Sequence, residues 1–492
     1  MRLRDRNRLF SLLVLAMASL SAMLLLSWPT AAQAVTAQHY TELEFPPLDE
    51  IQIPDYERYE LDNGLIVYLM EDHELPLISG SATFRTGDYL VSEAQVGLSG
   101  ITGEAMRLGG TEAYPPDQLS QLLEQRAASV ETGFDTTSGN ASFNTLSEDL
   151  DDVFALFADV VRRPAFAPDQ VELVKSQFRG GIARRNDNPD DVTTREFKQL
   201  IYGKASPYAR TVEYASLDNI SRDDVVDFYQ STIRPEGTIL GIVGDFDPAQ
   251  MKALIAEAFG DWQGQGQPTM PKPPDASQKQ TGVFAVEQPQ LTQSYIHIGH
   301  IGGELRNPYH APMVVLNEVL NGFGGRLFNE IRSRQGLAYS VYAFWSPRYD
   351  YPGMFIGGGQ TRSEATVPFI QAMLKQIEQI RQEPISEAEL QYAKDAVING
   401  FVFNFDTPDD TLSRLIRYEY YGYPSDFVFQ FQADVESATI EQVLKAAQTN
   451  LKPEQLVTIV VGNLAAIQPA LDTLGEGIVV TPVDIAIPPP SS

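Results

Sequence analysis

Residues 97–111 read Gly-Leu-Ser-Gly-Ile-Thr-Gly-Glu-Ala-Met-Arg-Leu-Gly-Gly-Thr, and this stretch sets the expectations for the rest of the chain. Its apolar residues recur at the spacing of one helical face, at Leu98, Ile101, Ala105 and Leu108. We therefore predict a helix here, although Gly100 and Gly103 lie inside it. Each glycine costs a helix roughly 1 kcal/mol relative to alanine, so the pair calls for a structural reason.

The stretch resembles the zinc-helix segment of the pitrilysin/insulinase family of inverted-motif zinc peptidases, and a resemblance to the mitochondrial-processing-peptidase-like branch of that family covers about residues 56–474. In that family two histidines on one helical face hold Zn²⁺, and a glutamate between them is the general base. The positions of the first histidine, the glutamate and the second histidine are here Gly100, Gly103 and Glu104. The resemblance therefore implies a degenerate zinc motif, without its ligands or its base.

The resemblance also places a third zinc ligand, a glutamate, on a later helix that ends shortly before an Asp-Asn-Pro turn. The turn is present as Asp187-Asn188-Pro189, and counting back puts the expected glutamate pair at Gly180 and Gly181. We therefore expect no metal and no other cofactor in this chain, and no catalytic residue from the zinc motif.

The other histidines offer no replacement for these ligands. His297 and His300 are three residues apart in a strand pattern, which puts their side chains on opposite faces. With no cysteine in the chain, a transition-metal site has few donors to draw on.

A segment in the second half of the chain resembles the family's substrate-binding segment. Residues 324–339 read Gly-Gly-Arg-Leu-Phe-Asn-Glu-Ile-Arg-Ser-Arg-Gln-Gly-Leu-Ala-Tyr. In the family, an arginine and a tyrosine seven residues later contact the bound peptide or the reacting carbonyl, and the matching residues are Arg332 and Tyr339. Taken without the resemblance, the same two residues read as a surface charge on a helix and an aromatic residue in a strand.

The two halves of the chain repeat each other. Residues 233–244 match residues 451–462 without a gap, at an offset of 218 residues, and the helices before them agree in register. A repeat of this length indicates two homologous domains. Mixed strands and helices predict an α+β fold, each domain a mainly antiparallel sheet packed with helices, and the family resemblance implies a clamshell of the two.

We predict six regions along the chain. They are a signal peptide (1–34), an N-terminal arm (35–54), a peptidase-like domain with the degenerate zinc site (55–263), a linker (264–281), a second peptidase-like domain with the Arg/Tyr segment (282–475) and a loose tail (476–492).

The first 34 residues have the features of an export signal. A basic start with four arginines precedes an apolar run from Leu9 to Trp28, and Ala32-Gln33-Ala34 resembles a cleavage site. The run, about 20 residues long, would also span a bilayer if the signal stays uncleaved, so a membrane anchor is the alternative. Export and the absence of cysteine favour a bacterial periplasm or cell envelope.

The composition is strongly acidic, with 65 Asp and Glu against 36 Lys and Arg and a net charge of -29. This charge argues against nonspecific binding of nucleic acid, which needs a basic surface. The charge is consistent with a soluble, self-repelling surface, or with steering of cationic peptides toward an acidic cavity.

These observations lead to one main hypothesis and three others. The main one is an exported family member that is inactive alone and binds the peptide substrate for a homologous, zinc-bearing subunit in a two-chain metalloendopeptidase. The others are a stand-alone peptide-binding clamshell, a scaffold subunit of a membrane complex, and an active enzyme with a displaced site.

Overall fold

Two six-stranded sheets, one in each half of the chain, organise the computed structural model, which describes residues 53–264, 272–322 and 324–490. The predicted signal peptide lies outside the described residues, as does nearly all of the predicted arm. Within the three described ranges, no helix is both long enough and apolar enough to cross a membrane.

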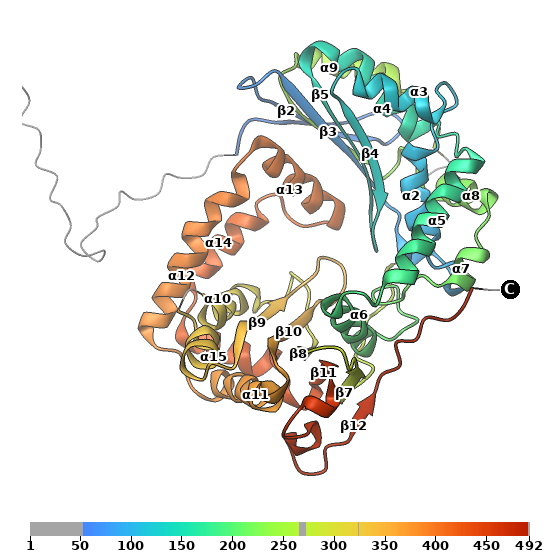
Figure 1. The fold of residues 1–492 in the computed structure, drawn as a ribbon. Helices are drawn as coiled ribbons and strands as arrows, with labels where there is room; N and C mark the ends of the chain where they lie inside the picture. Colours follow the sequence, from blue (N-terminus) through green and yellow to red (C-terminus); the bar gives the residue numbers. More distant parts are fainter. Residues whose placement is uncertain (1–52, 265–271, 323, 491–492) are drawn as a thin grey trace, which may run out of the picture. The chain divides into compact units, whose positions relative to one another are not determined.

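The first sheet has the strand order β1-β2-β6-β3-β5-β4, and all its neighbours are antiparallel except β2 and β6. Its strands are β1 (Glu57–Glu60), β2 (Ile66–Glu71), β3 (Leu77–Phe84), β4 (Ser129–Phe134), β5 (Gly139–Leu146) and β6 (Ile239–Gly244). Three helices cover one face, as Figure 1 shows: α3 (Pro116–Glu124), α4 (Leu150–Arg162) and α9 (Pro248–Phe259). Their apolar stripes pack with Phe84 and Phe143 of the sheet into one core.

A second group of helices packs beside this sheet around a core of its own. The group consists of α2 (Leu98–Leu108), α5 (Pro168–Arg184), α7 (Tyr214–Asp218) and α8 (Arg222–Thr232). The predicted helix at 97–111 is α2, and its apolar residues Leu98, Ile101 and Ala105 are buried in that core.

The second sheet has the order β12-β7-β11-β8-β10-β9. Its strands are β7 (Gly282–Glu287), β8 (Gln293–Ile301), β9 (Ala338–Ser346), β10 (Met354–Arg362), β11 (Val457–Gly462) and β12 (Val480–Pro482). Five helices of this half pack into one core with this sheet: α10 (His310–Asn321), α11 (Thr366–Gln382), α12 (Glu387–Phe401), α14 (Phe427–Ser437) and α15 (Ile440–Asn450). The predicted fold class, α+β with two similar, mainly antiparallel sheets and packed helices, is therefore confirmed.

The internal repeat is visible in the elements themselves. Strand β11 begins and ends 218 residues after β6, and both strands are fully buried. Helix α15 follows α8 at the same offset, and both begin with a capping box, at Ser221 and Thr439. Each half therefore supplies the same helix and central strand to its own sheet.

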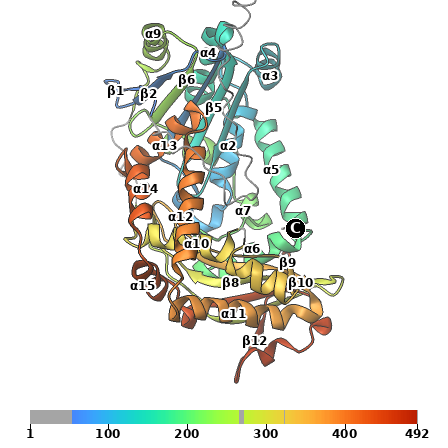
Figure 2. The same ribbon diagram turned by 90° about the vertical axis from the view of Figure 1, so that its left-hand side faces the viewer.

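Each half also packs one helix against the sheet of the other half. Helix α6 (Pro189–Tyr202), from the first half, lies against β8 and β11, where Phe197 is buried (Figures 1 and 2). Helix α13 (Pro408–Tyr421), from the second half, packs on β2, β3 and β6, where Ile416 is buried. This exchange buries apolar residues on the face of the first sheet that α4 and α9 leave uncovered.

The tail is more ordered than the sequence predicts. Strand β12 pairs with β7, and the amide of Val483 donates to the carbonyl of Ala285 at 2.8 Å. Further along, Asn186 Nδ2 donates to the carbonyl oxygen of Ile485 at 2.8 Å. The expectation of a loose tail is therefore wrong for residues 480–485, because β7 offers an edge on which this short strand pairs.

Candidate functional site

Gly103 is the point where α2 comes closest to the edge strand β4. A Cβ atom at Gly103 would lie 2.6 Å from the backbone nitrogen of Phe134 and 3.0 Å from the carbonyl carbon of Gly133. The hydroxyl of Thr132 donates to the carbonyl oxygen of Gly103 at 2.5 Å. The cost of this glycine in the helix is thus explained by backbone contact between α2 and β4, which leaves no room for a side chain.

Gly100 lies one turn earlier and faces α5. A Cβ atom here would lie 3.1 Å from the ring of Phe178. Gly180 and Gly181 lie on α5, just after Phe178, and Cβ atoms at these two positions would meet nothing within 4 Å. The structure thus brings α2 and α5 together at the predicted positions, with a phenylalanine ring facing Gly100.

Glu104 is the only one of the predicted zinc-motif positions that carries a side chain able to bind a metal. It is half-buried, and burial raises the pKa of its carboxyl. It forms no hydrogen bond or ion pair with any residue in the part of the chain that the structure describes. It therefore stands as a single carboxylate beside the glycines.

These residues do not fit a zinc ion. A catalytic zinc takes three protein ligands, commonly His, Glu or Cys, and the positions of the motif supply one carboxylate. Across residues 53–264, 272–322 and 324–490, no three His, Cys, Asp or Glu side chains are grouped so that they could hold a metal. Sequence reasoning did not predict that Phe134 and Phe178, from distant segments of the chain, lie beside the motif.

Arg332 and Tyr339 lie together, as the predicted pair requires. Arg332 belongs to a π-helix, Phe328–Arg334, and its guanidinium carbon is 4.9 Å from the centre of the Tyr339 ring. The same guanidinium is 4.8 Å from the ring of Phe328. The tyrosine is 82% exposed, so the pair presents a cation and an aromatic ring to solvent.

A β-bulge explains why Tyr339 is so exposed. Ala338 pairs with Thr361 and Ser340 pairs with Gln360, so Tyr339 has no partner on β10. A bulge in an edge strand redirects a side chain and increases the local twist. Strand β9 is the edge of the second sheet, and β4 is the edge of the first. On β9 the main-chain groups of Ala343 and Trp345 are bonded to Asn321 and Asn317 of α10, so an added strand would pair with the part of β9 that precedes Ala343.

The two strand histidines lie on opposite sides of β8. His297 Nε2 is 2.8 Å from the hydroxyl of Tyr342, and its ring contacts Phe197 of α6. His300 Nε2 accepts from the amide of Lys452 at 3.0 Å. Burial lowers the pKa of both imidazoles to about 4, so both are neutral near pH 7. They are core histidines rather than a pair of ligands.

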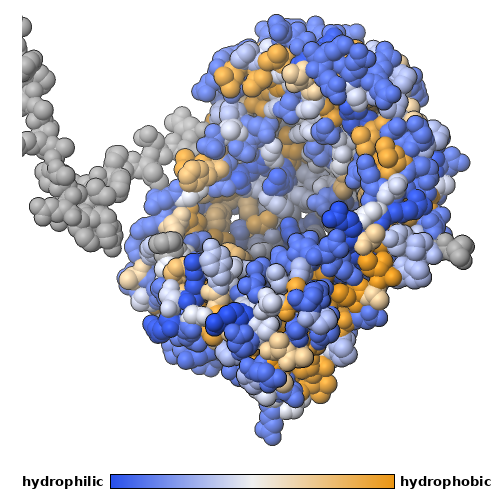
Figure 3. Space-filling view, in the orientation of Figure 1, coloured by the Kyte–Doolittle hydropathy of each residue, from blue (hydrophilic) through white to orange (hydrophobic). Residues whose placement is uncertain are grey.

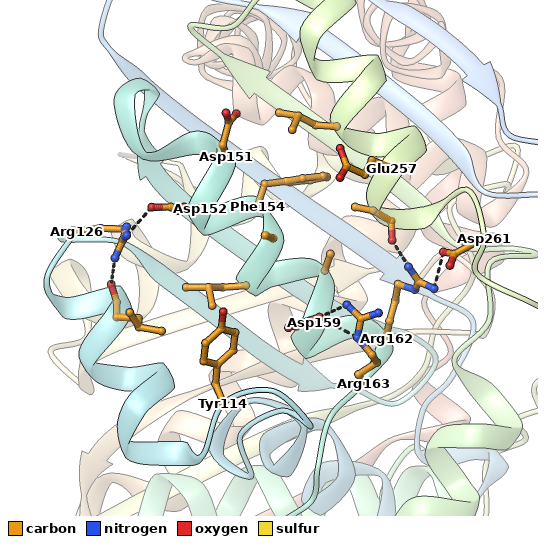
Figure 4. Close-up of a pocket in the computed structure, with 16 residues that line it drawn as sticks. Tyr114, Arg126, Asp151, Asp152, Phe154, Asp159, Arg162, Arg163, Glu257 and Asp261 are labelled. Atoms are coloured by element: carbon orange, nitrogen blue, oxygen red, sulfur yellow. Dashed lines mark hydrogen bonds and ion pairs between the residues drawn. The ribbon is translucent and has the colours of Figure 1, made fainter.

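A cavity of about 600 Å³ lies among α3, α4 and α9, and the three arginines that line it are paired with carboxylates (Figure 4). Arg126 is paired with Asp152, and Arg162 with Asp261 at 2.8 Å. Arg163 is paired with Asp159. The three cations are neutralised within the cavity wall, and Asp151 and Glu257 remain as additional carboxylates, so this cavity does not suit an anionic ligand.

Comparisons with known proteins identify the same family that the sequence motifs resemble. Residues 86–213 match the family model described as Insulinase (Peptidase family M16), and residues 219–397 match that of the Peptidase M16 inactive domain. An uncharacterized zinc protease of Mycobacterium leprae is 27% identical over 316 residues, which cover 61% of this chain and 68% of that protein. The Non-peptidase homolog YmxG of Helicobacter pylori is 21% identical over 396 residues, covering 80% and 90%.

Solved structures share the fold. A peptidase M16 inactive domain from Pseudomonas fluorescens superimposes with a TM-score of 0.75 at 23% identity, over 85% of this chain and 100% of that one. A protease from Helicobacter pylori gives a TM-score of 0.73 at 16% identity, over 83% and 99%.

Proposed function

The chain belongs to the insulinase family, peptidase family M16, as a homologue without the zinc motif, and from this premise we propose that it binds peptides for a zinc-bearing partner. The partner is a homologous subunit that supplies the metal and the general base, and the two chains act together as a metalloendopeptidase. Without it, the chain cleaves no peptide by zinc chemistry and needs no cofactor.

The observation that carries this proposal is the contrast between the two predicted sites. At the zinc motif, Gly103 is packed against the backbone of β4 and Glu104 is the single potential ligand. At the substrate segment, Arg332 and Tyr339 are side by side on an exposed edge. A chain that has lost the metal and retained the peptide contact is suited to substrate binding.

The chemistry of this pair fits an extended peptide. A peptide that adds to the edge of β9 beside Tyr339, before the stretch that α10 covers, gains main-chain hydrogen bonds, which do not depend on its sequence. The guanidinium of Arg332 can donate to a peptide carbonyl, and the hydroxyl of Tyr339 to an oxygen that gains charge during cleavage in the partner's site. We place this pair of chains in the bacterial periplasm or cell envelope, on the strength of the export signal predicted at residues 1–34.

The first test is isolation of the tagged chain from its native cell envelope, followed by sequencing of the proteins that elute with it. We expect a roughly equimolar homologue that carries an intact His-x-x-Glu-His helix. A chain that elutes alone and still holds peptides would instead be a stand-alone binder, and one that elutes with a membrane complex would be a scaffold subunit.

The second test uses the reconstituted pair and two matched variants. Arg332→Ala should lower peptide cleavage by about tenfold or more, because it removes a charge-assisted contact. Arg334→Ala is the control, since it removes an exposed arginine of the same π-helix that is paired with Glu330 at 2.7 Å. Equal activity of the two variants would remove Arg332 from the site.

A further inference from the structure

A second cavity, of about 390 Å³, lies beside α13 on the face of the first sheet that α4 and α9 leave uncovered, and elements of both halves line it. Its wall includes Ser81 and Thr83 of β3, Asn140 of β5, the turn between β4 and β5, the hairpin between β9 and β10, and α13. Figure 3 shows a hollow next to α13 whose border is mainly hydrophilic. No residue of this cavity belongs to the zinc motif or to the Arg332–Tyr339 pair.

The floor of the cavity is polar because of the alternation along β3. Ile78, Ala82 and Phe84 point into the helix-covered core, while Ser81 and Thr83 point to the opposite face and are partly accessible. Side chains in a strand alternate between faces, so the small hydroxyl groups line up beside Asn140 of the neighbouring strand. The floor thus offers several short side chains that can donate hydrogen bonds.

Two arginines, Arg348 and Arg417, stand over this floor without ion-pair partners. Neither guanidinium forms a hydrogen bond or an ion pair with any described residue. Other arginines of the chain form ion pairs with carboxylates. Arg58 is paired with Glu419 at 2.6 Å, and Arg326 with Glu389 at 2.6 Å. In a chain with 65 acidic and 36 basic residues, two unpaired cations in one cavity are a local exception to the overall charge.

The backbones that carry these two arginines are held firmly. The carbonyl oxygen of Arg348 accepts from the amide of Leu305 at 2.9 Å, which ties the hairpin to the strand end that precedes α10. Arg417 lies within α13, and its guanidinium carbon is 5.9 Å from the centre of the Tyr349 ring. The cations are thus presented by fixed elements, which lowers the ordering cost of binding an anion.

One carboxylate, Asp135, also lines the cavity, so the wall carries two positive charges and one negative. Asp350 lies close by, and burial raises the pKa of its carboxyl. The two guanidinium groups, together with hydroxyl and amide donors, suit a single anionic group of modest size.

We propose that Arg348 and Arg417 bind a carboxylate of the captured peptide, and so select peptides that carry an acidic group. This inference rests on the proposed peptide-binding function and adds a substrate preference to it. A carboxylate is planar and accepts two hydrogen bonds, which matches the donor geometry of a guanidinium. Its source is either an Asp or Glu side chain or the free C-terminus of the peptide.

The test measures binding of labelled peptides to the full chain by fluorescence anisotropy. The probes are an uncharged extended peptide of Val, Ser, Ala and Gln with an amidated C-terminus, the same peptide with Glu in place of one Gln, and the same peptide with a free C-terminal carboxylate. We expect one of the two carboxylate peptides to bind about tenfold more tightly than the uncharged one. Which of them does so identifies the source of the carboxylate.

The double variant Arg348→Gln and Arg417→Gln should abolish this preference and leave the affinity for the uncharged peptide unchanged. The control is the double variant Lys272→Gln and Arg362→Gln, which removes the same charge from exposed positions outside the cavity. Circular dichroism and the melting temperature check that each variant is folded.

The outcomes separate the two levels of the proposal. If all three peptides bind equally to the wild-type chain, or if the control variant loses the preference as fully as the cavity variant, the carboxylate site is wrong and peptide binding stands. If none of the peptides binds, the peptide-binding function itself is contradicted.

Discussion

Gly103 offers the sharpest test of how the degenerate motif is packed. Replacing it by alanine places a Cβ atom 2.6 Å from the backbone nitrogen of Phe134, and neither backbone can move independently of its helix or strand. Overpacking typically costs about 1–3 kcal/mol, and contact with backbone favours the upper part of that range. Replacing a helical glycine returns about 1 kcal/mol, so we expect a net loss of about 2 kcal/mol in the free energy of unfolding.

Gly100→Ala is the matched control in the same helix. Its Cβ atom would meet the far end of the Phe178 ring at 3.1 Å, and a side chain can shift by a few tenths of an ångström. This variant should therefore be as stable as the wild-type chain, or more stable by up to about 1 kcal/mol. Urea unfolding followed by the fluorescence of the buried Trp262 and Trp345 compares the variants. If Gly103→Ala unfolds at the same urea concentration as Gly100→Ala, the close helix–strand contact is not as described.

Three further predictions follow from the site, the edge strand and one ion pair. The triple change Gly100→His, Gly103→Glu and Glu104→His should not restore zinc binding, because position 103 lies against β4 and Gly181 supplies no third ligand. Mass spectrometry after dialysis measures the bound metal, and one zinc per chain would contradict this prediction. Tyr339→Ala should change the unfolding free energy by no more than about 0.5 kcal/mol, whereas Trp345→Ala, 1% exposed in the same strand, should cost about 3–5 kcal/mol in urea titrations. The Arg326 guanidinium holds the pKa of Glu389 at about 2, below its usual 4.5, so this pair stabilises the fold fully above about pH 4.5 and the contribution is lost as the pH falls toward 2. Because Glu389 is about a third exposed, solvent screening leaves about 1 kcal/mol, and Glu389→Gln should remove this pH dependence from the unfolding midpoints.

Local patterns predicted the elements of the fold well, because each pattern has a local physical cause. The repeat between residues 233–244 and 451–462 identifies β6 and β11 as equivalent strands. The helices before it were expected in register, and α8 and α15 do begin at equivalent positions, after Ser221 and Thr439. The helix of residues 98–108 was recognisable despite its two glycines, since Leu98, Ile101 and Ala105 form an apolar face, although Leu108 at its end is exposed.

Features that depend on distant contacts could not be predicted. Periodicity shows that α6 and α13 have an apolar face, but it does not show that this face packs on the sheet of the other half. The bulge at Tyr339 depends on the register with β10, and the role of Gly103 depends on how closely β4 approaches. Arg332 and Tyr339 were predicted from resemblance to a family. That Arg348 and Arg417 line the same cavity could be seen only in the three-dimensional structure.

The exchange of α6 and α13 also determines when the apolar surfaces of the two sheets become covered as the chain is synthesised. During translation the first sheet emerges long before residues 408–421, so apolar side chains such as Met70 and Val243 lack their cover until almost the whole chain is made. A gene cut at the linker would encode two fragments that each expose the surface meant for a helix of the other. Substitutions on α6 or α13 therefore act on the sheet of the opposite half, which couples the stability of the two halves.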